Sequence, residues 1–509
     1  MQNLISKLGE LNPQLFREIK GRLKTRGILI IVFLSLILQL MILGNTPNTQ
    51  RYALSIYNFY NGLSFSVIIA ILVSGTYVLI NDLATEQQRG TLNFIRLSPQ
   101  SSHSIFFGKM LGVHINGYIA ILLVIPIHLW MGLKLNLPLH QILISYIISI
   151  AASIFYYSAG ILFALVGFWL GNAQSRLAGG FIAIFLLFNQ EALCKDIPAN
   201  NPLVLFKLIH PQYFLAKPDN SFNLATFNWF GLPLGESFVI SATFSLLVYS
   251  IGTYFIWQSI ERCYHNPQTT MLSKKQSYCL TASFTAITLG CASSVNNENL
   301  FPLIFLNFGI FLYLIAALTP NYQTLQDWAR YQHFYSVKHP GKQKLVQDLI
   351  WGEKSPAILA IAINALIPLA SASIFISLSS MAASTKINAV VGLIFIFSLV
   401  LIYATLAQLM LFMKNEQRLL WTNTIMAAVI LLPIIILGIF ASINNSMENF
   451  LWFFTILSPV VILSPQTNIL VPLLALLGHA TILGLLLSQI KGRLHKVGQS
   501  ATKVLLAEN

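Results

Sequence analysis

The sequence predicts an all-α, polytopic membrane protein with about 12 transmembrane helices. Of its 509 residues, 56% are hydrophobic and only 9% are charged, and the mean hydropathy is +0.70. Soluble domains are less apolar and carry about 25% charged residues. Apolar runs long enough to cross the hydrocarbon core, which takes roughly 20 residues each, recur along the whole chain. A soluble fold is therefore excluded.

A basic amphipathic helix is predicted before the first apolar run, over residues 10–26. Leu11, Leu15, Ile19 and Leu23 recur every fourth residue and share one helical face. Five basic residues lie mostly on the other faces: Arg17, Lys20, Arg22, Lys24 and Arg26. Such a helix is typical of the membrane interface. A plain polybasic anchor that only orients the first span is the alternative.

The apolar runs that follow predict twelve spans. They are placed near residues 27–44, 63–81, 110–131, 141–170, 177–193, 236–258, 279–294, 301–318, 357–379, 388–412, 421–442 and 467–488. The apolar run at 450–464 is too short to cross a bilayer and is expected to be re-entrant or interfacial. The stretch 203–210, in the long outer segment 194–235, is expected to dip into the outer leaflet or to be a surface loop.

The distribution of basic residues sets the predicted orientation. With both termini in the cytoplasm, 24 of the 30 Lys and Arg residues fall on inner segments. Cytoplasmic loops carry such an excess of positive charge. The formal net charge of +14 is therefore explained by membrane topology, and no nucleic-acid partner is expected.

A weak internal repeat suggests two halves, 1–264 and 265–509, with six spans each. The tripeptide Asn12-Pro13-Gln14 recurs at Asn266-Pro267-Gln268, and the dipeptide Pro211-Gln212 recurs at Pro465-Gln466. Both offsets are 254, obtained as 266 − 12 and as 465 − 211. Transporters often show internal symmetry of this weak kind, although such short matches also arise by chance.

One polar segment, 82–109, lies between the second and third predicted spans, on the cytoplasmic side. Its middle, 90–97, has helical spacing with apolar Leu92, Ile95 and Leu97. Pro99 is expected to end this helix, because proline disfavours helical backbone at the residue before it. The alternatives are a short helix accessible from the cytoplasm and an ordinary solvated loop.

The residues of this segment resemble a known pattern. Its characteristic residues occur in the order E-x-x-x-G-T-L, then S-P, then G-K: Glu86, Gly90, Thr91, Leu92, Ser98, Pro99, Gly108 and Lys109. About thirty residues are similar to the first cytoplasmic loop of type-2 ABC transporter permeases. In that family this loop contains a coupling helix that docks on a separate ATP-hydrolysing subunit, and an elbow helix precedes the first span.

The resemblance implies a transmembrane exporter subunit and residues through which it docks. Glu86, Arg89 and Arg96 would form a polar rim around apolar contacts that include Leu92 and Ile95. It also implies a tandem fusion of two six-helix halves, a partner ATPase in two copies, and a location in the plasma membrane, which is the bacterial inner membrane. The transported substrate is not indicated by the sequence.

The second predicted half has its own cytoplasmic loop, 319–356, which departs from the pattern. It contains the sequence QDLIWGEKSPAIL but neither Gly-Thr-Leu nor a following Gly-Lys. A second docking loop is expected there, through Trp351, Glu353, Lys354, Ser355 and Pro356. Whether this half docks differently or unequally stays open.

Motifs of catalysis are missing from the sequence. There is no G-x-x-x-x-G-K-[ST] phosphate-binding loop and no H-E-x-x-H metal motif. The chain is therefore expected to be no enzyme, to hold no cofactor or metal, and to leave ATP and Mg²⁺ to the partner. Four cysteines, Cys194, Cys263, Cys279 and Cys291, show no C-x-x-C spacing, and no disulfide is expected.

Two other functions remain open from the sequence. An ion-coupled secondary transporter with twelve helices would need an ionisable group within its spans, and only histidines such as His114, His128 and His479 occur there. A membrane-embedded enzyme is a less favoured reading, because Asp196, Asp219 and Glu236 are too scattered to form a site.

Overall fold

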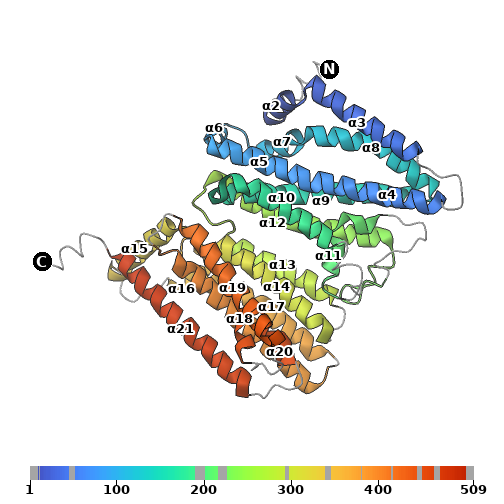
Figure 1. Ribbon diagram of the computed structural model, residues 1–509. Coiled ribbons are helices and arrows are strands. Elements are labelled where there is room, and N and C mark those ends of the chain that lie inside the picture. Colours follow the sequence, from blue (N-terminus) through green and yellow to red (C-terminus); the bar gives the residue numbers. More distant parts are fainter. Residues whose placement is uncertain are drawn as a thin grey trace. The chain divides into compact units, whose positions relative to one another are not determined.

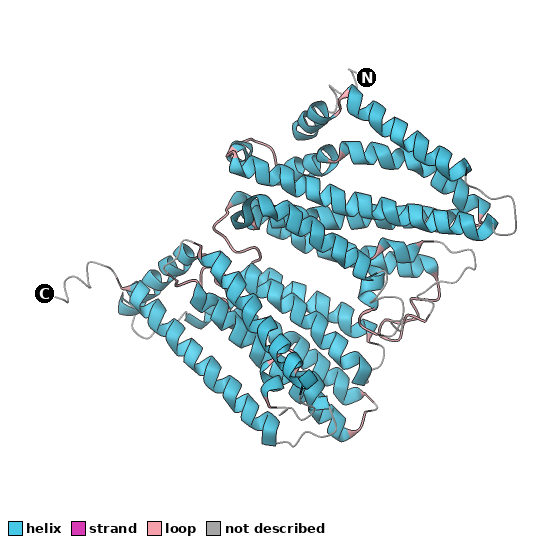
Figure 2. Cartoon of the chain, viewed as in Figure 1, coloured by secondary structure: helices cyan, strands magenta, loops and turns pink. Residues whose placement is uncertain are grey.

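The computed structural model describes residues 10, 12–44, 52–189, 201–215, 226–292, 297–338, 345–379, 381–413, 417–443, 450–463 and 470–499. Within these ranges the chain is helical, and the only β pairing is an isolated bridge between Trp229 and Leu232 (Figure 2). The predicted all-α fold class is confirmed for this part of the chain.

The chain forms two compact units, Met1–Pro267 and Gln268–Asn509. The internal repeat in the sequence predicts two halves, with the boundary between them after residue 264. The first unit runs in blue to green and the second in yellow to red in Figure 1. The longer helices of the first unit are α2 (Pro13–Arg22), α3 (Thr25–Gly44), α4 (Tyr52–Ile69), α5 (Gly75–Gln88), α7 (Ser102–Val113), α8 (Ile115–Lys134), α9 (Leu139–Val166), α10 (Gln174–Phe188) and α12 (Phe238–His265).

The second unit contains a similar set of helices. They are α13 (Lys274–Cys291), α14 (Asn297–Leu318), α15 (Tyr322–Lys338), α16 (Leu345–Trp351), α17 (Ile358–Leu378), α18 (Ala383–Met410), α19 (Arg418–Ile443), α20 (Ser458–Leu463) and α21 (Leu470–Gly498). Its core lies where α14, α17 and α18 pack together, around residues such as Leu314, Ile361 and Val400, all fully buried.

Nine helices in the described residues are long and apolar enough to cross a membrane, so the protein is a multi-pass membrane protein. They are Ile56–Gln88, Ile115–Lys134, Leu139–Val166, Phe238–His265, Asn299–Leu318, Ile358–Leu378, Ala383–Met410, Arg418–Phe440 and Leu470–Gly498. A tenth results if the bent pair Pro13–Arg22 and Thr25–Met41 forms one broken span.

Three of the twelve predicted spans do not correspond to one of these nine helices. The span predicted at 27–44 lies on α3, which belongs to the bent pair. The span predicted at 177–193 corresponds to α10, which is apolar but only 15 residues long. The span predicted at 279–294 lies on α13, whose first turn is Lys274-Lys275-Gln276-Ser277. A polar first turn shortens the apolar length, so this helix is not counted among the spanning candidates.

The span predicted at 63–81 lies within a helix that is longer than expected. It contains a π-helical turn, Ala70–Ser74, that joins α4 to α5. Such turns leave backbone carbonyl groups without their usual partners. Here the Tyr157 hydroxyl of α9 donates to the Ile71 carbonyl oxygen at 2.7 Å. The helix then continues to Gln88, well past the predicted end of the span.

The stretches expected to be re-entrant or interfacial form short helical turns. In the first unit these are α11 (Val204–Leu208) and the 3₁₀ turn η4 (Pro211–Phe214). In the second unit they are the 3₁₀ turn η5 (Leu451–Phe454) and α20. Several of their apolar side chains, among them Leu208, Phe214, Phe453 and Ile462, are buried within their own unit.

The two copies of the Asn-Pro-Gln tripeptide, on which the predicted repeat was based, lie at different positions relative to their helices. Asn12 caps the N-terminus of α2, with Pro13 in its first turn, whereas Asn266 follows the C-terminus of α12. The pair Pro465-Gln466 lies outside the described residues. The pairs Ser98-Pro99 and Ser355-Pro356 do occupy like places, because each lies between a short helix (α6, Thr91–Arg96, or α16) and the helix that follows it, α7 or α17.

Candidate functional site

The predicted cytoplasmic helix is present as α6, and Gly90 sets its direction. Gly90 adopts φ +72°, between the last residue of α5 and the first turn of α6. This left-handed backbone is open to glycine and strained for most other residues. The Thr91 hydroxyl donates to the Glu86 carbonyl oxygen at 3.1 Å, which ties α6 back to α5.

Helix α6 has one face inside the protein and one face in solvent. Leu92 is only 1% exposed, whereas Phe94 is 76% and Leu97 is 85% exposed. Ile95 is half-buried and Arg89 is exposed. The helix thus presents two large apolar side chains outward, while Leu92 fastens it to its own unit.

Arg96 holds the end of α6 against α12. Its guanidinium lies 5.6 Å from the centre of the Tyr264 ring, and Phe106 of α7 meets the same ring edge-on at 5.0 Å. Burial lowers the pKa of Arg96, and Tyr264 and Cys263 act against that shift. Tyr264 therefore joins three elements, α6, α7 and α12.

After α6 the chain turns at Ser98 and Pro99 into α7. The Ser98 hydroxyl donates to the Ile95 carbonyl oxygen at 2.7 Å. Ser101 caps α7 by accepting the Ser104 amide at 3.2 Å. A serine at this position stabilises a helix by satisfying an amide that has no partner within the helix.

Helices α2 and α7 approach each other closely through two glycines. A β-carbon on Gly108 would lie 2.7 Å from Asn12 Oδ1 and 2.9 Å from the Leu15 amide nitrogen. One on Gly112 would lie 2.5 Å from the β-carbon of Glu18. Asn12 also donates from Nδ2 to the Ser104 carbonyl oxygen at 2.8 Å.

This contact encloses a buried lysine. Lys109 of α7 has no exposed surface, and its Nζ lies 2.6 Å from Asp82 Oδ2, 2.8 Å from Glu86 Oε2 and 3.4 Å from Glu18 Oε1. Asp82 and Glu86 lie on α5, and Glu18 lies on α2. One ammonium group therefore connects three helices.

Two arginines of α2 complete the charge cluster, which we define as Arg17, Glu18, Arg22, Asp82, Glu86 and Lys109. Arg17 pairs with Glu86, and Arg22 pairs with Asp82. Three carboxylates thus face three cations, which is the balance that buried charges require. A polar cavity of about 390 Å³ lies beside the cluster and is also lined by Asn81, Thr85 and Arg89.

The cluster favours the charged forms of Glu18 and Lys109. Burial by itself raises the pKa of Glu18, but Lys109, Arg17 and Arg22 outweigh it, so the pKa lies below the ordinary value. Burial by itself lowers the pKa of Lys109, but Asp82, Glu86 and Glu18 outweigh it and raise the pKa. Oxygen atoms of the three carboxylates lie within 4.8 Å of one another, and the Lys109 ammonium already serves as their cation.

In the second unit, Lys274, the first residue of α13, fastens the loop 319–356 that contains α16. Lys274 is 3% exposed, and its Nζ donates to Ser355 Oγ at 2.6 Å and to the Leu349 carbonyl oxygen at 2.7 Å. The Asp348 and Pro356 carbonyl oxygens lie at 3.5 and 3.4 Å. Burial lowers its pKa to about 8, and Asp348 and Glu353 act against that shift.

Helix α16, which Lys274 caps, is exposed at residues 345–347 and at Trp351, and half-buried between them. Val346 is 56% and Trp351 is 48% exposed, and no residue of α16 is buried. Trp351 is braced by the Tyr278 ring at 5.6 Å and by Lys275 at 5.7 Å. Both units therefore present a short helix with exposed apolar side chains after a long helix and before a Ser-Pro pair.

Several predicted docking residues have little surface to offer a partner. Leu92, Gly108 and Lys109 are buried in the first unit, and Ser355 and Pro356 are buried in the second. Their structural role is to hold α6 and α16 in place. The exposed residues of the predicted set are Arg89, Thr91 and Pro99 in one loop, and Trp351, Glu353 and Lys354 in the other.

Two of the three acidic residues that pair with Lys109, Glu18 and Asp82, were not expected from the sequence, and the third, Glu86, was assigned to docking. The sequence places the leucines of α2 on one face and predicts that the helix lies at the membrane interface. In the structure the buried residues of α2 are Gln14 and Glu18. A signal was available, because Glu18 is an isolated acid within a basic helix and Asp82 follows directly on an apolar run. Lys274 was likewise counted only as a loop charge.

The histidines within the spans are engaged differently. His128 has both ring nitrogens in contact, with Ser64 Oγ and Tyr146 OH, each at 2.6 Å. His479 contacts Ser398 Oγ at 2.6 Å through Nδ1, and its buried Nε2 has no hydrogen-bond partner among the described residues. The described cysteines Cys263, Cys279 and Cys291 are free thiols, and Cys194 lies outside the described residues.

The chain shows no match to any family model, curated protein or solved structure with which it was compared.

Proposed function

We propose that this membrane protein is the transmembrane subunit of an ATP-driven exporter and that α6 transmits force from a separate ATPase. The observation that carries the proposal is the division of α6 into a buried and an exposed face. Phe94 and Leu97 are exposed on a helix that Leu92 and Arg96 hold to the rest of the first unit. A partner that gripped those two side chains would move α6 together with its anchors.

The charge cluster supports this role. Force applied to α6 reaches α5 through the turn at Gly90, and the charge cluster joins α5 to α2 and α7. Buried ion pairs with several hydrogen bonds are directional and are costly to break one partner at a time. The four helices would therefore move as one body instead of sliding past one another.

The second loop supports a second contact with the ATPase. Helix α16 stands at the corresponding place in the second unit, with Val346 and Trp351 exposed and Lys274 beneath it. Its sequence differs from that of α6, so the two contacts would be unequal. On this proposal two ATPase copies bind one chain and ATP and Mg²⁺ stay on them.

Changing Phe94 to Asp tests the proposal. The tagged full-length chain would be purified from native membranes, and a co-purifying subunit with a phosphate-binding loop would be identified by mass spectrometry. We expect Phe94→Asp to reduce capture of that subunit at least tenfold, because burying a carboxylate in an apolar contact is unfavourable. The amount of chain in the membrane should stay unchanged.

The matched control is Phe230→Asp, which alters a phenylalanine that is 48% exposed in the predicted outer segment 194–235. It should capture the ATPase as well as the unaltered chain does. Equal capture by Phe94→Asp and the unaltered chain would contradict the proposal.

An ion-coupled transporter is the second candidate, and His479 is the observation that favours it. It is an ionisable residue, 1% exposed, within a predicted span, and ionisable residues at membrane depth often mark proton or ion pathways. Transport by the purified chain in vesicles, abolished by an uncoupler and independent of nucleotide, would support this candidate over the exporter.

A further inference from the structure

The segment 201–215 contains α11 and η4, and we call it the α11–η4 segment. Two hydrogen bonds tie it to α12. The Ser245 hydroxyl donates to the Leu208 carbonyl oxygen at 2.5 Å. The Tyr249 hydroxyl donates to the Ile209 carbonyl oxygen at 2.6 Å. Both carbonyl groups lie at the end of α11, where a helix leaves its carbonyls without partners of its own.

Contacts with α4 and α10 hold the other half of the segment. Gln212 donates from Nε2 to Asn61 Oδ1 on α4 at 2.6 Å. The Tyr213 hydroxyl donates to the Asn189 carbonyl oxygen, just after α10, at 3.3 Å. Helical turns as short as α11 and η4 are not stable by themselves, so their positions depend on these bonds to longer helices.

His210 lies between the two turns and is fully buried. It is the N-cap of η4, and its Nδ1 accepts the Gln212 amide at 3.2 Å. Its Nε2 faces the Leu186 carbonyl oxygen of α10 at 3.3 Å. A backbone amide can only donate and a carbonyl oxygen can only accept. These two partners therefore fix a neutral ring that carries its hydrogen on Nε2.

A second proton on His210 would conflict with both the cap and the burial. It would make Nδ1 a donor, and Nδ1 would then face the Gln212 amide, which also donates. The bond that caps η4 would be lost. The positive charge would also be enclosed without water, which is costly for an unpaired ion.

None of the described side chains around the segment offsets such a charge. Lys207, the charged residue of α11, is basic and 4% exposed. The Tyr213 ring meets the His210 ring edge-on, with ring centres 5.6 Å apart. The titratable side chains that neighbouring helices bring to the segment are also tyrosines: Tyr57 and Tyr60 of α4, Tyr146 of α9 and Tyr249 of α12. Tyrosine hydroxyls are uncharged below about pH 10.

The pKa of His210 follows from this environment. Burial lowers the pKa to about 4, and hydrogen bonding to the Leu186 carbonyl oxygen acts against that shift. In a released segment the pKa would return to its ordinary value of about 6.5. The attached state is therefore fully favoured above about pH 6.5 and loses stability as the pH falls towards about 4.

We propose that His210 is an acid-sensitive clasp, which holds the α11–η4 segment in place while its ring is neutral and releases it when the ring takes up a proton. The release involves neither α6 nor an ATPase. Its test therefore stands apart from that of the proposed function.

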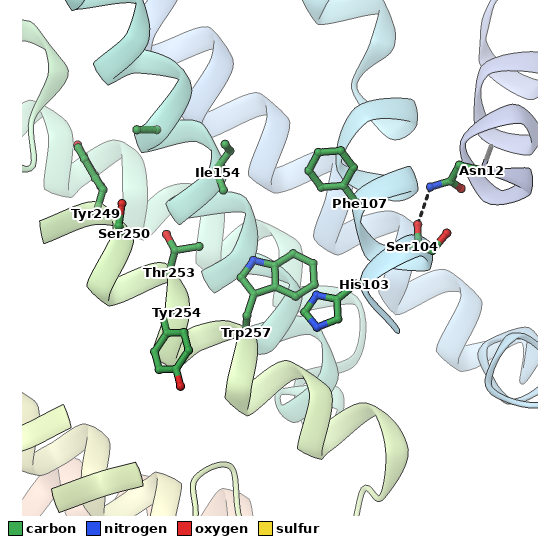
Figure 3. Close-up of a pocket in the computed structure, with 11 residues that line it drawn as sticks. Asn12, His103, Ser104, Phe107, Ile154, Tyr249, Ser250, Thr253, Tyr254 and Trp257 are labelled. Carbon is green, nitrogen blue, oxygen red and sulfur yellow. Dashed lines mark hydrogen bonds between the residues drawn. The ribbon is translucent and has the colours of Figure 1, made fainter. Parts of the chain in front are cut away.

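Release of the segment would also reach a cavity of about 720 Å³ in the first unit. This cavity lies among α7, α9 and α12, and Tyr249 stands at one end of it, beyond Ile154 and Trp257 (Figure 3). The bond from Tyr249 to the Ile209 carbonyl oxygen would break with the release. The clasp therefore fixes the side chain that forms this end of the cavity.

Hydrogen exchange of the full-length chain in detergent tests the clasp. Protection factors, from which the intrinsic effect of pH on exchange has been removed, are measured at about pH 7.5 and about pH 4.5. The amides of α18, in the second unit, serve as the reference. We expect protection of the α11–η4 segment to fall at least about tenfold relative to α18 in the acid sample.

His210→Asn is the decisive variant. Asparagine offers a side-chain oxygen that can cap η4, but it takes up no proton in this pH range. Protection of the segment should then change less than about twofold between the two pH values. His140→Asn, at an exposed histidine of α9, is the matched control and should keep the tenfold fall.

Unchanged protection of the segment in the unaltered chain would overturn the proposal, and so would a tenfold fall that persists in His210→Asn. A second measurement keeps the test decisive if asparagine holds the segment poorly at both pH values. In the unaltered chain with ¹³C-labelled histidine, the magnetic resonance signal of His210 should titrate together with the loss of protection. A ring that takes up its proton while the segment stays protected would contradict the clasp.

Discussion

Lys109 is the residue on which the contact between α2, α5 and α7 depends. It is fully buried and lies within 3.4 Å of three carboxylates from two other helices. A charge in this position is stable only while its partners are present, because its desolvation is otherwise uncompensated. Sequence alone placed Lys109 in a cytoplasmic loop and could not show whether it faced solvent, a partner or the interior.

Replacing Lys109 by Met should destabilise the protein by about 3–5 kcal/mol, because it removes the only buried one of the three cations that face the carboxylates and leaves an excess of negative charge. The free energy of unfolding, measured by denaturant titration in detergent, checks this. Lys20→Met, at an exposed lysine of α2, is the control and should change stability by less than about 0.5 kcal/mol. Equal effects of the two changes would show that the charge cluster does not hold the helices.

The contribution of Glu18 should disappear in acid. The folded-state pKa of Glu18 is lowered, so its stabilising effect is present above the unfolded value of about 4.3 and is lost as the pH falls through the folded value. The difference in melting temperature between the unaltered chain and Glu18→Gln should therefore be largest near neutral pH. It should shrink towards zero well below pH 4.3. A difference that stays constant with pH would contradict this role.

At the scale of elements, the glycines of α7 decide how closely α2 can pack. A β-carbon at Gly108 would meet backbone, namely the Leu15 amide nitrogen at 2.9 Å, which cannot move aside as a flexible side chain can. Sequence reasoning assigned Gly108 to docking because it belongs to the Gly-Lys pair. The structure shows that its small size serves a contact inside the unit.

Gly108→Ala should therefore push α2 away from α7 and cost about 1–3 kcal/mol, the usual effect of overpacking a close contact. Hydrogen exchange of the α2 amides should become faster. Gly180→Ala, on α10, has no atom within 4 Å of the added carbon and is the matched control. It should leave exchange in α2 unchanged, and unchanged exchange in both variants would show that the contact tolerates a methyl group.

At the scale of the whole molecule, the number of membrane crossings decides on which side each terminus lies. Length and apolarity alone do not show whether every predicted helix crosses the membrane. Nine candidate spans would place the two termini on opposite sides, whereas ten or twelve would place them on the same side. The excess of Lys and Arg on alternate segments favours the even number, with both termini in the cytoplasm.

Labelling of single cysteines tests this topology. In a chain without its natural cysteines, Leu97→Cys on α6 and Phe334→Cys on α15 should react with an impermeant reagent only when the cytoplasmic face is accessible. Phe230→Cys, an exposed residue of the predicted outer segment, should react from the opposite face. Reaction of Leu97→Cys from the outside would contradict both the topology and the proposed function.

Sequence alone determined the fold class, the position of most apolar helices and the presence of the short helix after Gly90. These features follow from local rules: a span needs a fixed apolar length, and Gly90 and Pro99 mark the limits of a helix with few residues between them. The count of spans was less well determined, because α10 is short and α13 begins with polar residues.

Only the tertiary structure decided which side of each polar element is buried. Glu18 and Lys109 are 91 residues apart, and Lys274 and Ser355 are 81 apart, so no periodicity along the chain relates them. The same structure turned Phe94 and Leu97 outward while burying Leu92. Whether a residue is buried depends on neighbours from distant parts of the chain, so the pattern within one helix cannot predict it.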